Sequence, residues 1–146
     1  MIAIDTNLLV YAHRADAPWH LAARQVLLDR VAAAEPWAIP HHALVEFLGI
    51  VTHPRIWKTP MPMAEAAEAV RMLQQAPHLH LLFDQETSLS TLLEIATEGQ
   101  LAGAMIHDAR IAACCLAHGV AELWTCDRDF SRFPRLRVRN PLIGKG

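Results

Sequence analysis

The sequence predicts an α/β sandwich built on parallel strands, and three observations carry this prediction. Short apolar runs alternate with helical patterns about 10 to 15 residues long. Two of these runs, near opposite ends of the chain, stop at an aspartate. Hydrophobic residues make up 53% of the 146 positions and charged residues 19%, which suffices for a substantial core. This length predicts one domain over residues 1–146.

The first half of the chain starts with an apolar run at residues 2–4, which predicts a buried strand ending at Asp5. Residues 16–18, Asp-Ala-Pro, are typical of a helix start because proline suits a first helical turn. The run at residues 37–39 predicts a second strand. Apolar residues recur three and four positions apart over residues 42–52, which predicts an amphipathic helix that the next proline ends.

The second half repeats the alternation. The predicted helices are residues 64–75, 88–98 and 104–118, and the predicted strands are residues 79–83 and 123–126. Gly119 is the expected C-terminal cap of the last helix, since glycine tolerates the left-handed backbone found there. The last strand leads directly into Asp127. Strands separated by helices of this length indicate parallel β-α-β units.

Composition also excludes several classes of protein. No apolar run reaches the roughly 18 residues of a membrane span, so we expect no transmembrane helix. The first residues lack the basic segment of a signal peptide. The three cysteines have no metal-binding spacing and no obvious disulfide pairing. These features predict a cytoplasmic protein with reduced thiols.

Positive charge is concentrated near the C-terminus, where six of the 13 basic residues fall in the last 19 positions. They are Arg128, Arg132, Arg135, Arg137, Arg139 and Lys145. Such a stretch can steer a phosphate backbone or an acidic partner, or it can be an ordinary solvated surface. Charge alone does not decide between these two interpretations.

Two pairs of acids stand out from their surroundings. Asp5 and Asp127 follow apolar strands, and in a parallel sheet such positions meet at one edge if the strands are neighbours. Glu46 and Asp108 interrupt apolar helices, where a charge is rarely buried unless it is paired or bound to a metal. The alternatives are turn or cap roles for the aspartates, and an exposed helix face or pairing with Arg110 for the other two.

If the four carboxylates lie close together, their negative charges must be neutralised. Two unit charges 4 Å apart repel by about 4 kcal/mol at an effective dielectric near 20. Protonation or a divalent cation relieves this repulsion. All-oxygen ligands favour Mg²⁺ or Mn²⁺ over zinc, and such an ion suits phosphoryl chemistry. The residues themselves leave the substrate open.

Some of the nine histidines lie near these acids. His41 and His42 precede Glu46 by about one turn, and His107 precedes Asp108. They could tune the site or touch phosphate. Because histidines are spread over the whole chain, we expect most of them at the surface or at helix ends.

Four segments, in order along nearly the whole chain, resemble the motifs of PIN-domain nucleases, specifically the VapC toxins of bacterial toxin–antitoxin pairs. They are residues 5–12, 46–55, 107–113 and 125–130, and the tail that continues to residue 142 is also similar. The resemblance implies a three-layer α/β/α sandwich with a mainly parallel central sheet. It implies Mg²⁺- or Mn²⁺-dependent endoribonuclease activity, in which metal-activated water hydrolyses a structured cellular RNA of the tRNA or rRNA class. An antitoxin partner and a homodimer are also implied.

The resemblance also assigns roles by position. Asp5, Glu46, Asp108 and Asp127 would be the catalytic acids and metal ligands, Asp129 an auxiliary ligand, and Thr6, Asn7 and Thr125 residues that orient carboxylates or water. One metal or two are both compatible with this set. The alternative is a catalytically silent PIN-like protein that binds RNA or antitoxin, against which the presence of all four acids argues.

Overall fold

A parallel sheet forms the centre of the computed structural model, which describes residues 1–143. Its strands are β1 (Ile2–Ile4), β2 (Trp37–Pro40), β3 (Leu79–Leu82), β4 (Glu122–Trp124) and β5 (Val138–Arg139). They lie in the order β3-β2-β1-β4-β5, and every pairing between them is parallel. The predicted parallel sheet is therefore confirmed. The first strand of the chain lies at its centre, between β2 and β4.

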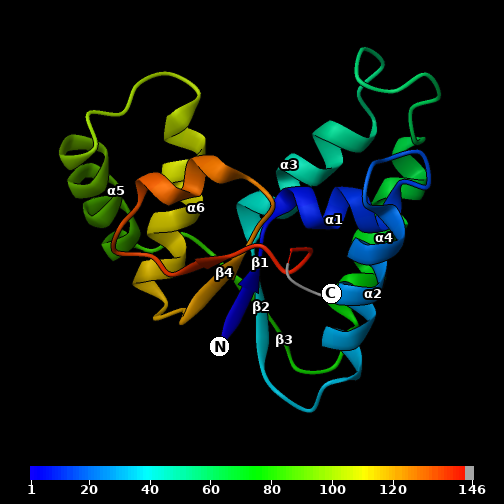
Figure 1. Ribbon diagram of the computed structural model, residues 1–146, viewed down its shortest axis with the longest axis horizontal. Coiled ribbons are helices and arrows are strands. Elements are labelled where there is room, and N and C mark those ends of the chain that lie inside the picture. The colour runs from blue at the N-terminus through cyan, green and yellow to red at the C-terminus, as the bar shows by residue number, and fades with distance from the viewer. Residues whose placement is uncertain (144–146) are drawn as a thin grey trace.

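Helices cover both faces of this sheet, which makes three layers (Figure 1). The helices are α1 (Thr6–His13), α2 (His20–Ala32), α3 (His41–Val51), α4 (Met63–Gln74), α5 (Glu86–Glu98) and α6 (Met105–Ala117). The pair α5 and α6 packs on one side, and α1, α2 and α4 lie on the other (Figure 1). Among the described residues, no helix combines the length and apolar character that crossing a bilayer requires.

Helix α1 is the main element that the sequence pattern did not predict. Its run Leu8–Leu9–Val10 lacks the polar stripe of an amphipathic helix, because the helix is covered on several sides. It packs against both α2 and α3. Since α1 begins directly after Asp5, it carries Thr6 and Asn7 away from the sheet edge at a fixed angle.

The predicted helix start at residues 16–18 was wrong. Helix α2 begins only at His20, because Trp19 adopts a left-handed backbone with φ of 63°. The carboxylate of Asp16 does not cap a helix. It accepts hydrogen bonds from Arg14 Nε and Nη2, at 2.9 and 2.6 Å.

The remaining boundaries differ by one or two residues for local reasons. Helix α5 starts two residues early because Gln85 and Ser88 form a reciprocal capping box. The last predicted strand stops at Trp124, because the amide of Cys126 turns to donate to the Asn7 side chain. Gly119 follows α6 with φ of 68°, as predicted for a cap.

Small side chains set the distance between α6 and the sheet. Ala109, Ala112, Ala113 and Cys115 are almost fully buried, so this face of the helix presents little bulk. The helix packs on β2 and on the short 3₁₀ segment η1 (Arg128–Arg132). This packing holds the first turn of α6, with Asp108, beside the loop that follows β4.

Candidate metal centre

The strand-end aspartates meet at the carboxyl edge of the sheet. Strands β1 and β4 are direct neighbours, with Ile4 opposite Trp124. The amide of Asp5 continues this ladder by donating to the carbonyl of Trp124, at 3.0 Å. Asp5 and the loop carrying Asp127 therefore leave the sheet side by side, as the sequence predicted for neighbouring strands.

Asp5 is buried, with only 3% of its surface exposed. Its Oδ2 accepts a hydrogen bond from Thr125 Oγ1 at 2.7 Å. Burial raises the pKa of Asp5 to about 7, and the negative charges of Glu46 and Asp108 add to the rise, while the bond from Thr125 opposes it. The electrostatics thus link Asp5 to acids from two different helices.

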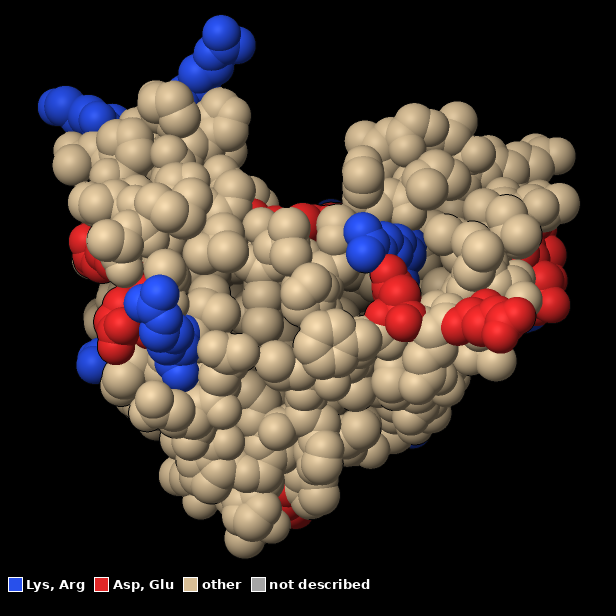
Figure 2. Space-filling view, turned by 180° about the vertical axis from the view of Figure 1, so that it is seen from behind, with Lys and Arg blue, Asp and Glu red and all other residues tan. Residues whose placement is uncertain are grey.

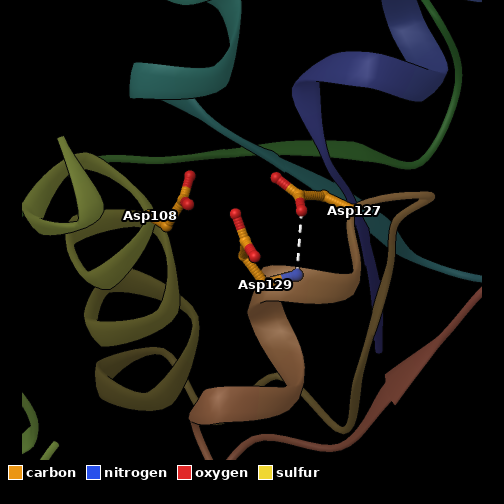
Figure 3. A group of neighbouring side chains, drawn as sticks. All are labelled: Asp108, Asp127 and Asp129. Atoms are coloured by element: carbon orange, nitrogen blue, oxygen red, sulfur yellow. Dashed lines mark hydrogen bonds between the residues drawn. The ribbon is translucent and has the colours of Figure 1, made fainter.

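Asp108, Asp127 and Asp129 form a close group of acids. Each offers a carboxylate oxygen, and these oxygens lie within 4.8 Å of one another. Asp108 comes from α6, while the two other side chains face it from η1 and the loop before it (Figure 3). The amide of Asp129 donates to Asp127 Oδ1 at 2.8 Å. The pKa of Asp108 is raised to about 6, mainly by burial and also by repulsion from Asp127, Glu46 and Asp129.

Glu46 approaches the group from α3. Its Oε2 accepts a hydrogen bond from Thr6 Oγ1 at 3.2 Å, and its Oε1 lies 2.9 Å from His42 Nε2. Thr6 and Thr125 thus each donate a hydrogen bond to an acid. Asn7 does not: its Oδ1 accepts the amide of Cys126, so it holds the loop that leads to Asp127.

Two contacts at the site were not predicted. Arg110 does not pair with Asp108. It donates from Nε to Asp84 Oδ2 at 2.6 Å and from Nη1 to His42 Nδ1 at 3.1 Å. His42 is therefore part of the site rather than a surface residue, and burial, followed by the charge of Arg110, lowers its pKa. The spacing of four between His42 and Glu46 was the only signal in the sequence that could have shown this.

Glu46 and Asp108 line an open hollow in the surface. The space-filling view shows a notch between two lobes, with acidic side chains at its floor (Figure 2). A pocket of about 570 Å³ opens beside Glu46 and Asp108, and its lining includes His42, His53 and His107. A polymer can enter such an open cleft, whereas an enclosed cavity would admit only small molecules.

Arg135 and Arg137 of the basic C-terminal stretch are engaged in ion pairs rather than in the lining of this pocket. Arg135 pairs with Glu94 at 2.9 Å and with Glu98, and Arg137 lies 3.8 Å from Glu122. Lys145 lies outside the described residues. These pairs favour the interpretation of this stretch as ordinary charged surface.

The donor chemistry fits a hard divalent cation. The candidate ligands are carboxylate oxygens, the type that Mg²⁺ and Mn²⁺ prefer. The raised pKa values of Asp5 and Asp108 arise partly from repulsion by neighbouring acids, which a bound cation would relieve. The residues form an acidic group able to bind a metal ion.

Comparison with known proteins places this arrangement in a defined class. The family model described as "PIN domain" matches residues 2–136, so the chain is a PIN domain. The chain is 38% identical over 146 residues to ribonuclease VapC43 of Mycobacterium tuberculosis, covering 99% of this chain and 98% of the relative. It is 34% identical to ribonuclease VapC31 of the same organism, and the match covers 97% of this chain and 100% of that relative. The chain therefore belongs to the VapC family of PIN-domain proteins.

Solved structures share the fold. VapC20 of Mycobacterium tuberculosis, described as a sarcin–ricin loop cleaving toxin, superposes with a TM-score of 0.70 at 15% identity, over 90% of this chain and 93% of that one. A chain of VapBC2 of Rickettsia felis, solved bound to a promoter DNA fragment, superposes with a TM-score of 0.68 at 21% identity. The match covers 96% of this chain and 98% of that one. At these identities the likeness supports the architecture alone.

Proposed function

We propose that this protein is a Mg²⁺- or Mn²⁺-dependent endoribonuclease that acts as the toxin of a toxin–antitoxin pair. The observation that carries the proposal is the group of three carboxylates from α6 and the segment after β4. Glu46 lies with Asp108 in the lining of an open pocket, and both repel the buried Asp5. Membership in the VapC family, whose relatives are named ribonucleases, supports the same activity.

In this proposal Asp5, Glu46, Asp108 and Asp127 would hold the ion, with Asp129 as an auxiliary ligand. A bound divalent cation supplies an activated water and charge stabilisation for phosphodiester hydrolysis. Thr125 orients Asp5, and Thr6 orients Glu46, through the hydrogen bonds described above. The cleft walls admit an RNA strand to the acids.

The direct test is incubation of the purified protein with total cellular RNA. We expect discrete fragments with Mg²⁺ or Mn²⁺ and none with EDTA. Asp108→Asn, which keeps the shape of the side chain but removes its charge, is expected to lower cleavage more than about 100-fold, beyond the loss typical of an outer-sphere residue. Cleavage by wild-type protein in EDTA, or by the variant at the wild-type rate, would contradict the proposal.

The remaining parts of the proposal concern substrate, partners and location. The substrate is a structured RNA of the tRNA or rRNA class, and sequencing of cleavage ends after induction in cells identifies it. A cognate antitoxin and a second copy of the chain complete the assembly in the cytoplasm, and native mass spectrometry of the purified complex tests both. A protein that binds RNA or antitoxin but yields no metal-dependent fragments would instead be a catalytically silent PIN domain.

A further inference from the structure

We propose that His42 is a positioning residue that holds Glu46 toward the metal centre, and that Arg110, anchored by Asp84, fixes the tautomer of the His42 ring. The inference rests on the proposed function, because it gives Glu46 a partner in the ion site. It concerns residues for which no role follows from the acidic motifs themselves.

The contacts form one continuous chain of side chains. Asp84 Oδ2 accepts from Arg110 Nε at 2.6 Å, and Arg110 Nη1 lies 3.1 Å from His42 Nδ1. The opposite nitrogen of the ring, Nε2, lies 2.9 Å from Glu46 Oε1. The chain therefore runs from the segment after β3, through α6, to the carboxylate on α3.

The order of donors and acceptors determines where the ring proton sits. A guanidinium group carries only N–H donors and no acceptor. His42 Nδ1 must therefore accept from Arg110, which requires an unprotonated Nδ1 and places the proton on Nε2. Glu46 Oε1 lies 2.9 Å from this buried Nε2, within ion-pair distance, but the ring N–H is not aligned with that oxygen. A small rotation of the ring or of the carboxylate would let Nε2 donate to Glu46 when the ion is bound.

Glu46 needs such support more than the other acids do. Its side chain is long, and ordering a glutamate side chain costs up to roughly 2 kcal/mol of rotamer entropy. Both of its oxygens are contacted, one by Thr6 and the other by His42. With these two contacts the carboxylate faces the cleft in one orientation, where it repels Asp5 and Asp108.

Burial makes the contact to His42 effective. The His42 side chain is 12% exposed and the Glu46 side chain 27%, so water competes little for the polar contact between them. The Arg110–Asp84 pair is more open, at 42% and 39%. We therefore expect the contact between histidine and glutamate to have the larger effect, and the arginine pair to act through it.

The first test uses His42→Leu, which removes the donor, and His42→Gln, whose side-chain amide can donate to Glu46 from a similar position. The readout is Mn²⁺ affinity of the full chain without RNA, measured by electron paramagnetic resonance. We expect His42→Leu to weaken Mn²⁺ binding about 10- to 100-fold and His42→Gln to restore most of it. With RNA, kcat should fall more than KM rises.

Matched controls come from neighbouring positions. His41 precedes His42 on α3 but stacks on Phe83, with ring centroids 4.8 Å apart, so His41→Leu should leave Mn²⁺ affinity unchanged. Arg71 pairs with Glu68 on the exposed face of α4, so Arg71→Met controls for Arg110→Met. Arg110→Met should weaken Mn²⁺ binding less than His42→Leu does.

A second measurement observes the His42 ring directly, so it requires neither RNA cleavage nor a substitution at His42. Nitrogen-15 spectra of the full chain report which ring nitrogen is protonated. We expect His42 to carry its proton on Nε2 in the wild type and to mix both tautomers in Arg110→Met. Proton on Nδ1 in the wild type would overturn the inference even if His42→Leu fails to fold.

The outcomes separate this inference from the proposed function. Wild-type protein that binds Mn²⁺ and cuts RNA, with His42→Leu equal to it in both, overturns only the role of His42. If His42→Gln loses as much Mn²⁺ affinity as His42→Leu, the role of His42 is likewise overturned. Wild-type protein that neither binds Mn²⁺ nor cuts RNA overturns both.

Discussion

The acids that follow strands and the acids that lie on helices are held in different ways. Asp5 is fixed almost entirely by the sheet, because its amide belongs to the β1–β4 ladder and its carboxylate is buried under Thr125. Glu46 projects from α3 on a long side chain and depends on Thr6 and His42 for its orientation. The strand side of the centre is thus preset by backbone topology, while the helix side requires a network of side chains.

The largest expected effect is at Asp5, where one substitution should stabilise the fold and abolish RNA cleavage. The pKa of Asp5 rises from 3.8 to about 7 on folding, so its contribution to stability is present at acid pH and is lost as pH rises toward 7. At pH 7.5 without metal, Asp5→Asn should therefore raise the free energy of unfolding by at most about 4 kcal/mol. Cleavage of RNA should be abolished.

Urea denaturation in EDTA between pH 4.5 and 7.5 measures this effect. The wild type should lose stability across that window, and Asp5→Asn should lose less. Asp29→Asn, on the exposed face of α2, is the matched control and should follow the wild type. A variant less stable than the wild type at pH 7.5 would show that Asp5 is not destabilised by its surroundings.

The next effect concerns Thr125, the hydroxyl that connects both strand-end acids. Thr125 Oγ1 donates to Asp5 and accepts the amide of Asp127 at 3.0 Å, and the residue is only 2% exposed. Thr125→Val keeps the shape and leaves these buried groups unpaired, which should cost about 1–3 kcal/mol of unfolding free energy. Cleavage should fall about 10- to 100-fold, as for other outer-sphere partners.

Thr125→Ser retains the hydroxyl and should stay near the wild type in both thermal denaturation and cleavage assays. Equal losses in the serine and valine variants would assign the role of Thr125 to its methyl group. The hydroxyl of Thr125 would then not be what orients the two acids that follow strands.

The smallest effect is expected at Thr6, on the helix side. Its hydrogen bond to Glu46 is longer, at 3.2 Å, and Glu46 retains its contact to His42. Thr6→Val should weaken Mn²⁺ binding by about 0.5–1.5 kcal/mol, with Thr6→Ser near the wild type. Isothermal titration calorimetry with Mn²⁺ measures this loss of affinity. If Thr6→Val lost as much Mn²⁺ affinity as Thr125→Val, the acids that follow strands and those on helices would not differ in how they are held.

The same distinction determines what could be predicted from the sequence. Asp5 and Asp127 were predictable, because apolar runs that stop at an acid mark strand ends and neighbouring strand ends converge. Helix α1 was not, because a helix buried on several sides has no polar stripe to reveal its period. The site role of Arg110 was also hidden, since its partners Asp84 and His42 lie 26 and 68 positions away along the chain.

The sheet order has a consequence for the timing of synthesis. Strand β1 is synthesised long before one of its two neighbours, β4, which begins at Glu122. A nascent chain that has reached α6 carries Asp5, Glu46 and Asp108 but still lacks Asp127 and the strand that shields β1 on that side. The acidic centre is therefore completed only after Asp127 has been synthesised, and a nascent chain that stops before it cannot assemble the centre.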